Sequence, residues 1–528
     1  MKISHHVPPL VRSVARISTL CFIAQSGLHA AELKYSLAPE AENFQFGSRT
    51  VAVGDLNDDG ITEIAVADPS YRAPGNLFGS GIVYLLNGID GSLIRSFEGS
   101  PARAQGFGSS MVALHADGDD FPDLAVGANG YADSNGPGAG AVWIYSGADG
   151  SVISTTFGPS GSGYGTALAN AGDHDADGLD DLYVGAPRAN GSRGQVILQS
   201  SLDGSYLWTL DSGASASGFG THIVALDDVD EDGRRDLAVA APDVRVESSS
   251  VGRVSIFRSS DQQLAAERFG SGFFNLLGYS LEAVDDANGD GLRDLMVGSY
   301  NGGTCLVVSG SDLSLIADLS DPSIVPYQAM NAGGSFDADG DGISDWLIGS
   351  AGMSRADTAV FGGVRILSGA DQSVLFSLDS PVSRTGLGGK LAVLPGFGIA
   401  ITETTLTDPE TNGQGAVQVW EFEQFASNPD RDGDGVNDDE DVVPDSDMSA
   451  TLVLLGVDSG VENRVDEKGR TLADRFAKYS DPGSRRQTIR YFCRINAKIY
   501  SLYRRGIISR TEARSMQRAS VVGLFRNW

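Results

Sequence analysis

Cysteine, histidine and long apolar runs are all scarce in this chain of 528 residues, and each scarcity argues against a class of protein. Of the three cysteines, only Cys305 and Cys493 lie beyond the first 30 residues, so we expect no disulfide framework. No segment approaches the roughly 20 apolar residues of a membrane span, and we expect no transmembrane segment. With six histidines and no G-x-S-x-G, Walker or H-E-x-x-H pattern, we expect no enzyme.

Acidic residues are abundant, with 69 Asp and Glu against 38 Lys and Arg, and a short acidic loop recurs six times. The clearest copy, residues 173–181, follows Tyr164-Gly165 and precedes a strand-like run from Leu182 to Pro187. Oxygen ligands at alternate positions suit a hard cation with six to eight ligands, so the loops predict bound calcium. Side chains at positions 1, 3, 5 and 9 would bind it with the carbonyl of position 7, while Gly at position 6 allows the turn.

The predicted calcium ligands fall into six groups. The first three loops supply Asp55, Asn57, Asp59, Ile61 and Glu63; Asp117, Asp119 and Asp123; and Asp173, Asp175, Asp177, Leu179 and Asp181. The next three supply Asp228, Asp230, Asp232, Arg234 and Asp236; Asp286, Asn288, Asp290, Leu292 and Asp294; and Asp337, Asp339, Asp341, Ile343 and Asp345.

An alternative interpretation is that these loops are ordinary turns without a bound ion. Asp, Asn and Gly also build ordinary turns, but six copies in register concentrate like charges that a cation would neutralise. The second loop matches worst, with His115 at position 1 and Asp120 in place of glycine. We expect His174, at position 2 of its loop, to be a solvated turn residue.

Short strands repeating every 40 to 60 residues predict a mainly β fold, a seven-bladed β-propeller. Strand-like runs flank the acidic loops, which excludes EF-hands, because those need a helix on each side. Aromatic-Gly or Leu-Gly dipeptides mark the blades at Phe46, Phe107, Tyr164, Phe219, Leu277 and Leu387, with one more expected near Tyr327. The seventh blade has no acidic loop. Residues 33–37 should complete it as an outer strand and close the ring.

The repeated motif resembles the FG-GAP repeats of the integrin α-subunit propeller, over roughly residues 33–425. The resemblance implies calcium in hairpin loops on one face and partner recognition by loops of the opposite face. Six candidate loops exceed the number that integrin α-subunits usually fill, which implies a stronger dependence on calcium. The resemblance carries over no ligand, integrin β-subunit or membrane anchor.

The ends of the chain differ from this repeated region. Residues 1–30, with basic residues before a short apolar run, resemble a secretory signal peptide, so we expect a secreted or cell-surface protein with the propeller at 31–425. Residues 426–448 resemble a thrombospondin type 3 calcium repeat, with Pro444 at a position typical of that family. A dockerin or EF-hand interpretation also fits this segment, because Asp441 lies at position 12 of the loop. The predicted ligands of this connector are Asp430, Asp432, Asp434, Asp438 and Asp441.

Residues 449–528 form a basic tail, in which 16 Lys and Arg face 7 acidic residues from residue 451 onward. Capping boxes beginning at Thr471, Ser484 and Ser509 predict a small C-terminal α-helical domain. Its arginines favour either a solvated helical face or attachment to an anionic cell surface. Nucleic acid is not expected as a partner.

Taken together, these features predict a secreted, calcium-binding adhesion or interaction module with an unidentified protein or glycan ligand. The alternative is a propeller that binds or hydrolyses polysaccharide, in which two acids outside the ion loops would act. Aromatic residues clustered on one surface would favour that alternative. Four tryptophans, Trp143, Trp208, Trp346 and Trp420, are instead expected in the core.

Overall fold

A computed structural model of the chain contains six four-stranded antiparallel sheets and one five-stranded sheet. The structure describes residues 10–13, 31–39, 45–57, 61–73, 79–100, 106–119, 121–132, 136–213, 217–272, 274–301, 303–320, 330–351, 362–379, 386–395, 398–403, 415–422, 451–454, 457–462, 495, 499 and 513–517. The chain divides into a larger unit, Met1–Leu56 with Thr62–Phe425, and a smaller unit, Asn57–Ile61 with Ala426–Trp528.

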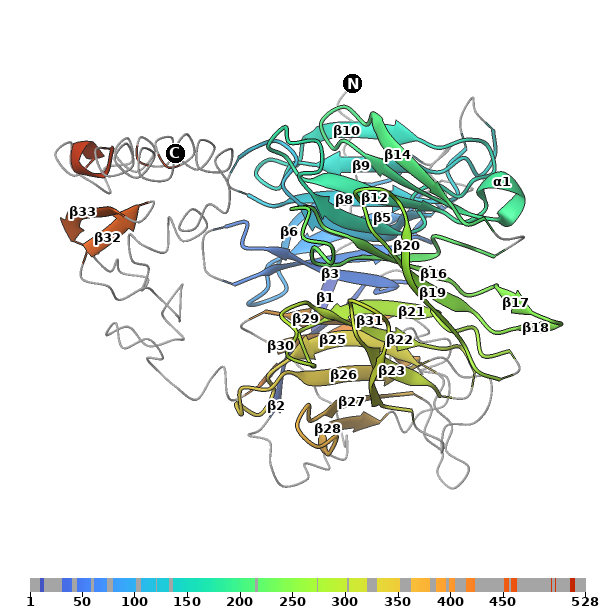
Figure 1. Ribbon diagram of the computed structural model, residues 1–528. Coiled ribbons are helices and arrows are strands. Elements are labelled where there is room, and N and C mark those ends of the chain that lie inside the picture. The colour runs from blue at the N-terminus through green and yellow to red at the C-terminus, as the bar shows by residue number, and fades with distance from the viewer. Residues whose placement is uncertain are drawn as a thin grey trace. The chain divides into compact units, whose positions relative to one another are not determined.

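The sheets of the larger unit are the blades of a seven-bladed β-propeller (Figure 1). Blades one to three contain β3 (Arg49–Gly54), β4 (Glu63–Asp68), β5 (Ile82–Leu86) and β6 (Leu93–Glu98); β7 (Phe107–Leu114), β8 (Asp123–Ala128), β9 (Ala141–Tyr145) and β10 (Val152–Phe157); and β11 (Leu168–Gly172), β12 (Asp181–Ala186), β13 (Gln195–Gln199) and β14 (Tyr206–Asp211). Blades four to six contain β15 (His222–Ala225), β16 (Leu237–Ala241), β19 (Arg253–Phe257) and β20 (Leu264–Phe269); β21 (Ser280–Val284), β22 (Asp294–Gly298), β23 (Cys305–Val308) and β24 (Leu315–Asp318); and β25 (Asn331–Phe336), β26 (Asp345–Ser350), β27 (Gly363–Leu367) and β28 (Val374–Asp379).

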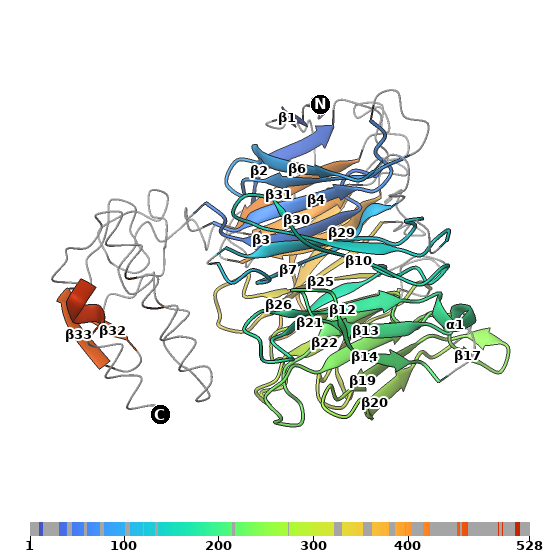
Figure 2. The same cartoon turned by 90° about the horizontal axis from the view of Figure 1, so that it is seen from above.

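The seventh blade joins the two ends of the propeller sequence, as the sequence predicted. Its strands are β29 (Leu387–Leu394), β30 (Gly398–Glu403), β31 (Ala416–Phe422) and β2 (Ala31–Pro39), with β1 (Leu10–Ser13) outside β2. In the register of β2 on β31, Ala31 lies opposite Phe422 and Leu37 opposite Val417. Figure 2 shows β2, in blue, next to β31, in orange. The expected closing strand is thus confirmed, and β1 places a strand within the predicted leader.

The first strands of the blades form a closed ring around the propeller axis. Each contacts the next, from β3 through β7, β11, β15, β21 and β25 to β29, and β29 contacts β3. The second strands β4, β8, β12 and β26 are buried at every residue, because both faces of each sheet pack against a neighbouring blade. The core therefore consists of apolar layers between successive blades, one of which joins Phe107 and Tyr145 to Val83 and Phe97 of the blade before.

The blade-marking dipeptides lock each blade to its predecessor. Their first residues are at most 3% exposed, and Tyr164, Phe219, Leu277 and Leu387 each bridge in parallel to a glycine that precedes the third strand of the preceding blade. Gly165 has φ +79°, and a Cβ there would lie 2.7 Å from the Ala141 carbonyl oxygen. The dipeptide is thus an apolar plug followed by a residue that must be glycine. The marker expected near Tyr327 lies outside the described residues.

Two connections on the propeller carry extra elements. The turn α1 (Ala189–Ser192) lies between β12 and β13, and the hairpin of β17 (Arg245–Val246) and β18 (Ser249–Ser250) lies between β16 and β19. Both lie on connections from second to third strands. Because adjacent strands are antiparallel, these connections leave the end of each blade opposite to that of the acidic loops.

The small C-terminal α-helical domain expected for residues 449–528 is not supported by the structure. The first element described there is an antiparallel hairpin, β32 (Thr451–Leu454) and β33 (Val457–Glu462). Beyond it the structure describes Ile495, Ile499 and residues 513–517, all in helical conformation. The predicted cap residues Thr471, Ser484 and Ser509 lie outside the described residues. No helix within the described part of the chain is both long and apolar enough to cross a membrane.

Candidate functional site

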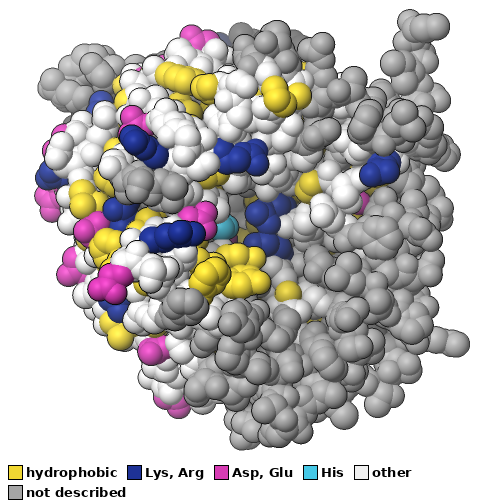
Figure 3. Space-filling model, turned by 90° about the vertical axis from the view of Figure 1, so that its right-hand side faces the viewer, with side chains coloured by type: hydrophobic (Ala, Val, Ile, Leu, Met, Phe, Trp, Pro, Cys, Tyr) yellow, Lys and Arg dark blue, Asp and Glu magenta, His cyan; other side chains and the backbone are white. Residues whose placement is uncertain are grey.

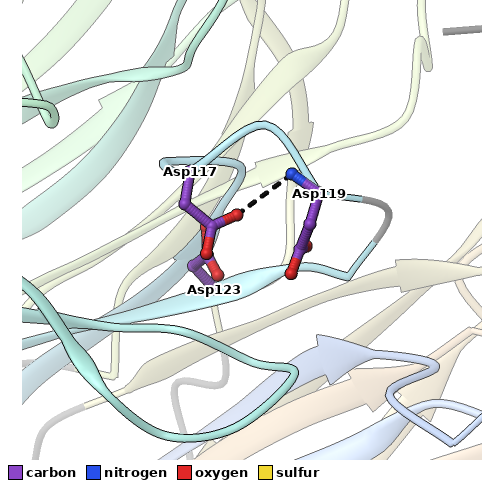
Figure 4. Close-up of side chains that lie close together, drawn as sticks. All are labelled: Asp117, Asp119 and Asp123. Atoms are coloured by element: carbon purple, nitrogen blue, oxygen red, sulfur yellow. Dashed lines mark hydrogen bonds between the residues drawn. The ribbon is translucent and has the colours of Figure 1, made fainter. Parts of the chain in front are cut away.

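The acidic loops connect the first and second strands of blades one to six, so they gather at one end of the propeller. In four of them three carboxylates each offer an oxygen within 4.8 Å of the others. These groups are Asp117, Asp119 and Asp123; Asp173, Asp175 and Asp181; Asp228, Asp230 and Asp236; and Asp337, Asp339 and Asp345. Figure 4 shows the first group, whose three carboxylates converge although the sequence ranked this loop lowest.

The last acid of each loop is completely buried, and in the second, fourth, fifth and sixth loops it joins two hairpins of its blade. In the fourth loop, Asp236 Oδ2 accepts the Val229 N–H at 2.9 Å and Asp236 Oδ1 accepts the Ser259 N–H, from the hairpin between the third and fourth strands, at 2.7 Å. Asp345 makes the equivalent pair of bonds with Ala338 and Gly369, at 2.7 and 2.9 Å. This acid therefore has a structural role that does not depend on a metal.

We call this pair of backbone hydrogen bonds the clamp. Its first bond, to the N–H of position 2, is present in the other loops as well. Oδ2 of Asp123, Asp181 and Asp294 accepts the N–H of Ala116, His174 and Ala287 at 2.6, 2.7 and 2.8 Å, and Glu63 Oε2 accepts that of Leu56 at 2.5 Å. Asp181 is the exception on its other side, because its Oδ1 is buried without a hydrogen-bond partner among the described residues.

The remaining ligand positions fold the loop over the buried acid. The carboxylate at position 1 accepts a hydrogen bond from the backbone N–H of the glycine at position 6. Asp286 Oδ2 does so from Gly291 at 2.7 Å, and Asp337 Oδ2 does so from Gly342 at 2.9 Å. Position 5 accepts the N–H of position 7, as in Asp177 with Leu179 at 2.8 Å. The same bond joins Asp232 to Arg234, Asp290 to Leu292 and Asp341 to Ile343.

Two loops differ from this arrangement. In the fifth, the Asn288 amide nitrogen donates to Asp290 Oδ2 at 3.0 Å and to Asp294 Oδ1 at 3.3 Å. In the first, Asp55 and Glu63 belong to the larger unit, Asn57 and Ile61 group with the smaller unit, and Asp59 lies outside the described residues. The ligand set of the first loop therefore stays a sequence prediction.

The electrostatics of the loops favour a bound cation. Burial, together with a smaller contribution from the neighbouring carboxylates, raises the pKa of Asp181 to about 7 and those of Asp123 and Asp345 to about 6. A hard cation would remove this penalty, since it stabilises the ionised form of every carboxylate around it. The all-oxygen donors, the buried acid and the unpartnered Asp181 oxygen therefore suit a hard divalent cation.

The expectation that His174 is solvated is wrong. Its side chain is 6% exposed, and its ring packs edge-on against Tyr183 and Trp208, with centroids 6.4 Å away in both cases. Burial lowers the pKa of His174 to about 4, so the ring is neutral at pH 7. Position 2 points into the space between blades three and four, a preference that spacing within the loop does not reveal.

One predicted region, the connector at residues 426–448, cannot be compared with the structure. The connector ligands Asp430, Asp432, Asp434, Asp438 and Asp441 lie outside the described residues.

Of the four tryptophans expected in the core, Trp346 and Trp420 are 4% and 0% exposed, and Trp143 and Trp208 pack half-buried against core clusters. Cys305 is buried and free.

A cavity of about 390 Å³ on the propeller axis was missed by the sequence analysis. Residues from β3, β7, β11, β15, β21 and β29 line it, and they include Arg49, Glu282 and Lys390. No motif could have found these charges, because each stands alone in a different blade. The acidic loops, in contrast, can be recognised in the sequence because their pattern is repeated.

Comparison with known proteins agrees with the blade structure. Residues 48–86, 107–145 and 219–257 match the FG-GAP repeat, and these segments form parts of blades one, two and four. The chain is 34% identical over 162 residues to integrin alpha-4 of Xenopus laevis, covering 26% of this chain and 14% of that protein. It is 26% identical over 253 residues to human integrin alpha-8, covering 44% of this chain and 22% of that protein.

A third relative, integrin alpha-V of Gallus gallus, is 30% identical over 212 residues, covering 36% of this chain and 20% of that protein. The chain thus matches less than a quarter of the length of each of these relatives. Blade topology and sequence similarity together show a mainly β chain with FG-GAP repeats and a β-propeller like that of integrin α-subunits.

Proposed function

We propose that the chain is a non-enzymatic adhesion or interaction module outside the cell, with blades stabilised by calcium. One observation carries the proposal: in four blades, a buried carboxylate and two neighbouring ones offer oxygens within 4.8 Å of one another. Without a cation these like charges repel one another and oppose folding, whereas a bound cation would neutralise them and hold the loop closed.

Extracellular calcium fits this design for a physical reason. Weak calcium sites suit extracellular modules, where the ion is plentiful, and a ligand that binds only the folded state adds to its stability. The leader and the similarity to integrin α-subunits support the same location. We assign the recognition of a protein or glycan ligand to the end of the propeller that carries α1 and the β17–β18 hairpin, because the acidic loops occupy the other end.

The parts beyond the propeller receive supporting roles. Residues 426–448 would bind another calcium through their acidic side chains and shorten into a compact connector. The basic tail would attach the molecule to an anionic surface. The test compares full-length chain with chain ending at residue 448 on anionic and neutral liposomes. Salt-sensitive retention of only the longer chain on anionic vesicles supports the role, whereas equal retention of both chains contradicts it.

Calcium measurements on the full chain test the central proposal. Isothermal titration should give several sites, and the melting temperature should fall in EDTA and recover with added calcium. Magnesium at equal concentration serves as the control, because it demands a smaller and more regular octahedral site. A melting temperature and protease resistance that EDTA leaves unchanged would refute the role of calcium.

A further inference from the structure

The cavity on the propeller axis has a charge arrangement that the acidic loops do not explain. Arg49 and His222 are the first residues of β3 and β15, and Lys390 lies in β29, so these groups come from three separate blades. Glu282, in the middle of β21, faces the same cavity. Arg235 and Arg293, which precede the second strands of their blades, line its acidic-loop end.

The charges at the two ends of the cavity differ in their partners. At the acidic-loop end, the Arg293 Nε lies 3.0 Å from Asp227 Oδ1, and Arg235 donates to the Asn170 carbonyl oxygen at 3.4 Å. At the other end, the only described residue that accepts a hydrogen bond from the Arg49 guanidinium is its neighbour Ser48, through its carbonyl oxygen at 2.9 Å. Among the described residues, neither the Lys390 ammonium nor the Glu282 carboxylate has a hydrogen bond or ion pair.

The positive charges of Arg49 and Lys390 repel each other. The nearby Arg49 guanidinium, with desolvation inside the cavity, lowers the pKa of Lys390 to about 7. Desolvation also raises the pKa of Glu282 to about 7, although this side chain is exposed where it lines the cavity. Burial also lowers the pKa of His222 to about 3, so this ring contributes no charge at pH 7. An anion placed between Arg49 and Lys390 would relieve their repulsion, and a guanidinium offers it a two-pronged donor.

The balance of charge and hydrogen-bond acceptors narrows the class of anion. Arg49, Lys390 and Glu282 together carry about one net positive charge when all are ionised, which matches a monoanion better than a phosphate dianion. Thr166 and Thr221 already donate their hydroxyl protons to the Gly163 and Gly218 carbonyls, at 2.6 and 2.5 Å. Together with Glu282 they therefore present acceptors, which a ligand with several hydroxyl groups would satisfy.

A partly exposed pair of aromatic side chains lies close to Arg49. Tyr279 is 37% exposed, and its ring centroid is 5.1 Å from that of Tyr300. It directly precedes β21 and is electrostatically coupled to Arg49. Aromatic rings with a polar edge suit ligands that have both an apolar face and hydroxyl groups. Figure 3 shows the propeller end with α1 and β17–β18, where Lys and Arg side chains gather around a hollow beside a histidine.

We propose that the axial cavity binds the carboxylate of a sugar acid between Arg49 and Lys390, with its hydroxyl groups toward Glu282 and its ring near Tyr279. The inference deepens the proposed interaction function, on which it rests, by naming the site and the ligand class. A single sugar acid fits a cavity of about 390 Å³.

Binding by the full chain in calcium tests the proposal with glucuronate as the probe, glucose as its uncharged counterpart and inorganic phosphate as the competing anion. Glucuronate should bind more tightly than either. Arg49→Gln and Lys390→Gln should each weaken it at least tenfold, while Arg245→Gln, which removes an exposed charge from β17, should leave it unchanged. Tighter binding of phosphate, equal binding of glucose, or unaltered affinity in both cavity variants would overturn the assignment.

Glu282→Gln separates the role of the hydroxyl groups from simple charge attraction. It removes a negative charge, so acetate should bind more tightly, whereas glucuronate should gain less because it loses a charged acceptor for its hydroxyl groups. Equal gains for both anions would contradict the hydroxyl contact.

A measurement on the unaltered chain covers the case in which the cavity variants fail to fold. Amine acetylation followed by mass spectrometry should show protection of Lys390 by glucuronate but not by glucose. No protection would refute the site. The calcium-dependent melting temperature, recorded on the same sample, shows separately whether the calcium role holds.

Discussion

Replacing Asp236 and Asp230 separately by alanine distinguishes the two roles that the acidic loops combine. Asp236 is buried and accepts two backbone N–H groups, from Val229 and Ser259. Asp230 is exposed, belongs to the same carboxylate group, and accepts only the Ser260 hydroxyl, at 2.9 Å. Both variants lose a metal ligand, but only Asp236→Ala also loses the clamp.

The magnitudes follow from the bonds that each variant loses. A buried N–H without an acceptor costs about 1–3 kcal/mol, so Asp236→Ala costs about 2–6 kcal/mol through two such groups. Relief of repulsion between neighbouring carboxylates returns about 1 kcal/mol per pair at a separation of about 4 Å in water. Asp236 forms two such pairs, with Asp228 and Asp230, so we expect Asp236→Ala to destabilise the calcium-free protein by about 0–4 kcal/mol. Asp230→Ala loses only the repulsion and should leave the protein unchanged or more stable by up to about 2 kcal/mol.

Calcium adds an equal term to both variants. At a free concentration 100 times the dissociation constant, an ion that binds only the folded state contributes about 2.7 kcal/mol, which each variant loses at this loop. Thermal unfolding followed by tryptophan fluorescence measures both terms while calcium is lowered stepwise. With an unfolding entropy near 2.1 cal/mol/K per residue, a propeller of roughly 400 residues shifts by about 1 °C per kcal/mol.

Two results would refute this reasoning. If Asp236→Ala is as stable as Asp230→Ala in EDTA, the two hydrogen bonds of Asp236 do not stabilise the blade, because both variants relieve the same number of carboxylate repulsions. If Asp230→Ala is as stable as the unaltered chain at saturating calcium, the fourth loop holds no stabilising ion.

Three further predictions concern other parts of the propeller. Deleting residues 32–38 removes the strand on β31 and should lower the melting temperature; an unchanged value would reject ring closure by β2. Phe219→Ala, at a fully buried side chain, should cost about 3–5 kcal/mol in chemical denaturation, against about 1 kcal/mol or less for Phe269→Ala, whose side chain is 43% exposed. Glucuronate affinity should fall between pH 6 and pH 8, because Lys390 loses its positive charge and Glu282 gains its negative charge near pH 7; a flat titration curve would contradict their place in the site. The other charged or titratable groups near Lys390 in the cavity are Arg49, His222, Arg235 and Arg293.

The blades and their closure could be predicted because both are encoded locally and repeated. An aromatic-Gly pair, an acidic loop and an Ala-Val strand recur in one order, and each copy supports the others. Even the closing strand follows from counting, since the last hairpin lacks an outer partner and residues 33–37 lack an inner one. The second loop, which lacks two ligand-pattern residues, still folds because Asp123 keeps its bond to Ala116.

The axial cavity could not be predicted, for a geometrical reason. Each charge sits on the innermost strand of a different blade, and its neighbours in sequence are ordinary strand residues. Only closure of the ring brings Arg49 near Lys390, from opposite ends of the propeller sequence. The burial of His174 was missed for the same reason, since Trp208, which covers it, lies on the outer strand β14 of its blade.

The arrangement of charge along the blades makes the two candidate sites nearly independent. Arg49 begins β3 and the acidic loop follows its end, so a strand of six residues separates the cavity cations from the carboxylates of that blade. At about 3.3 Å per residue the separation is about 20 Å, or roughly two and a half Debye lengths at physiological ionic strength. Screening of that order leaves little direct attraction between a calcium ion in the loop and an anion at Arg49. A sugar acid would therefore depend on calcium only through the integrity of the ring, which brings Arg49 and Lys390 together.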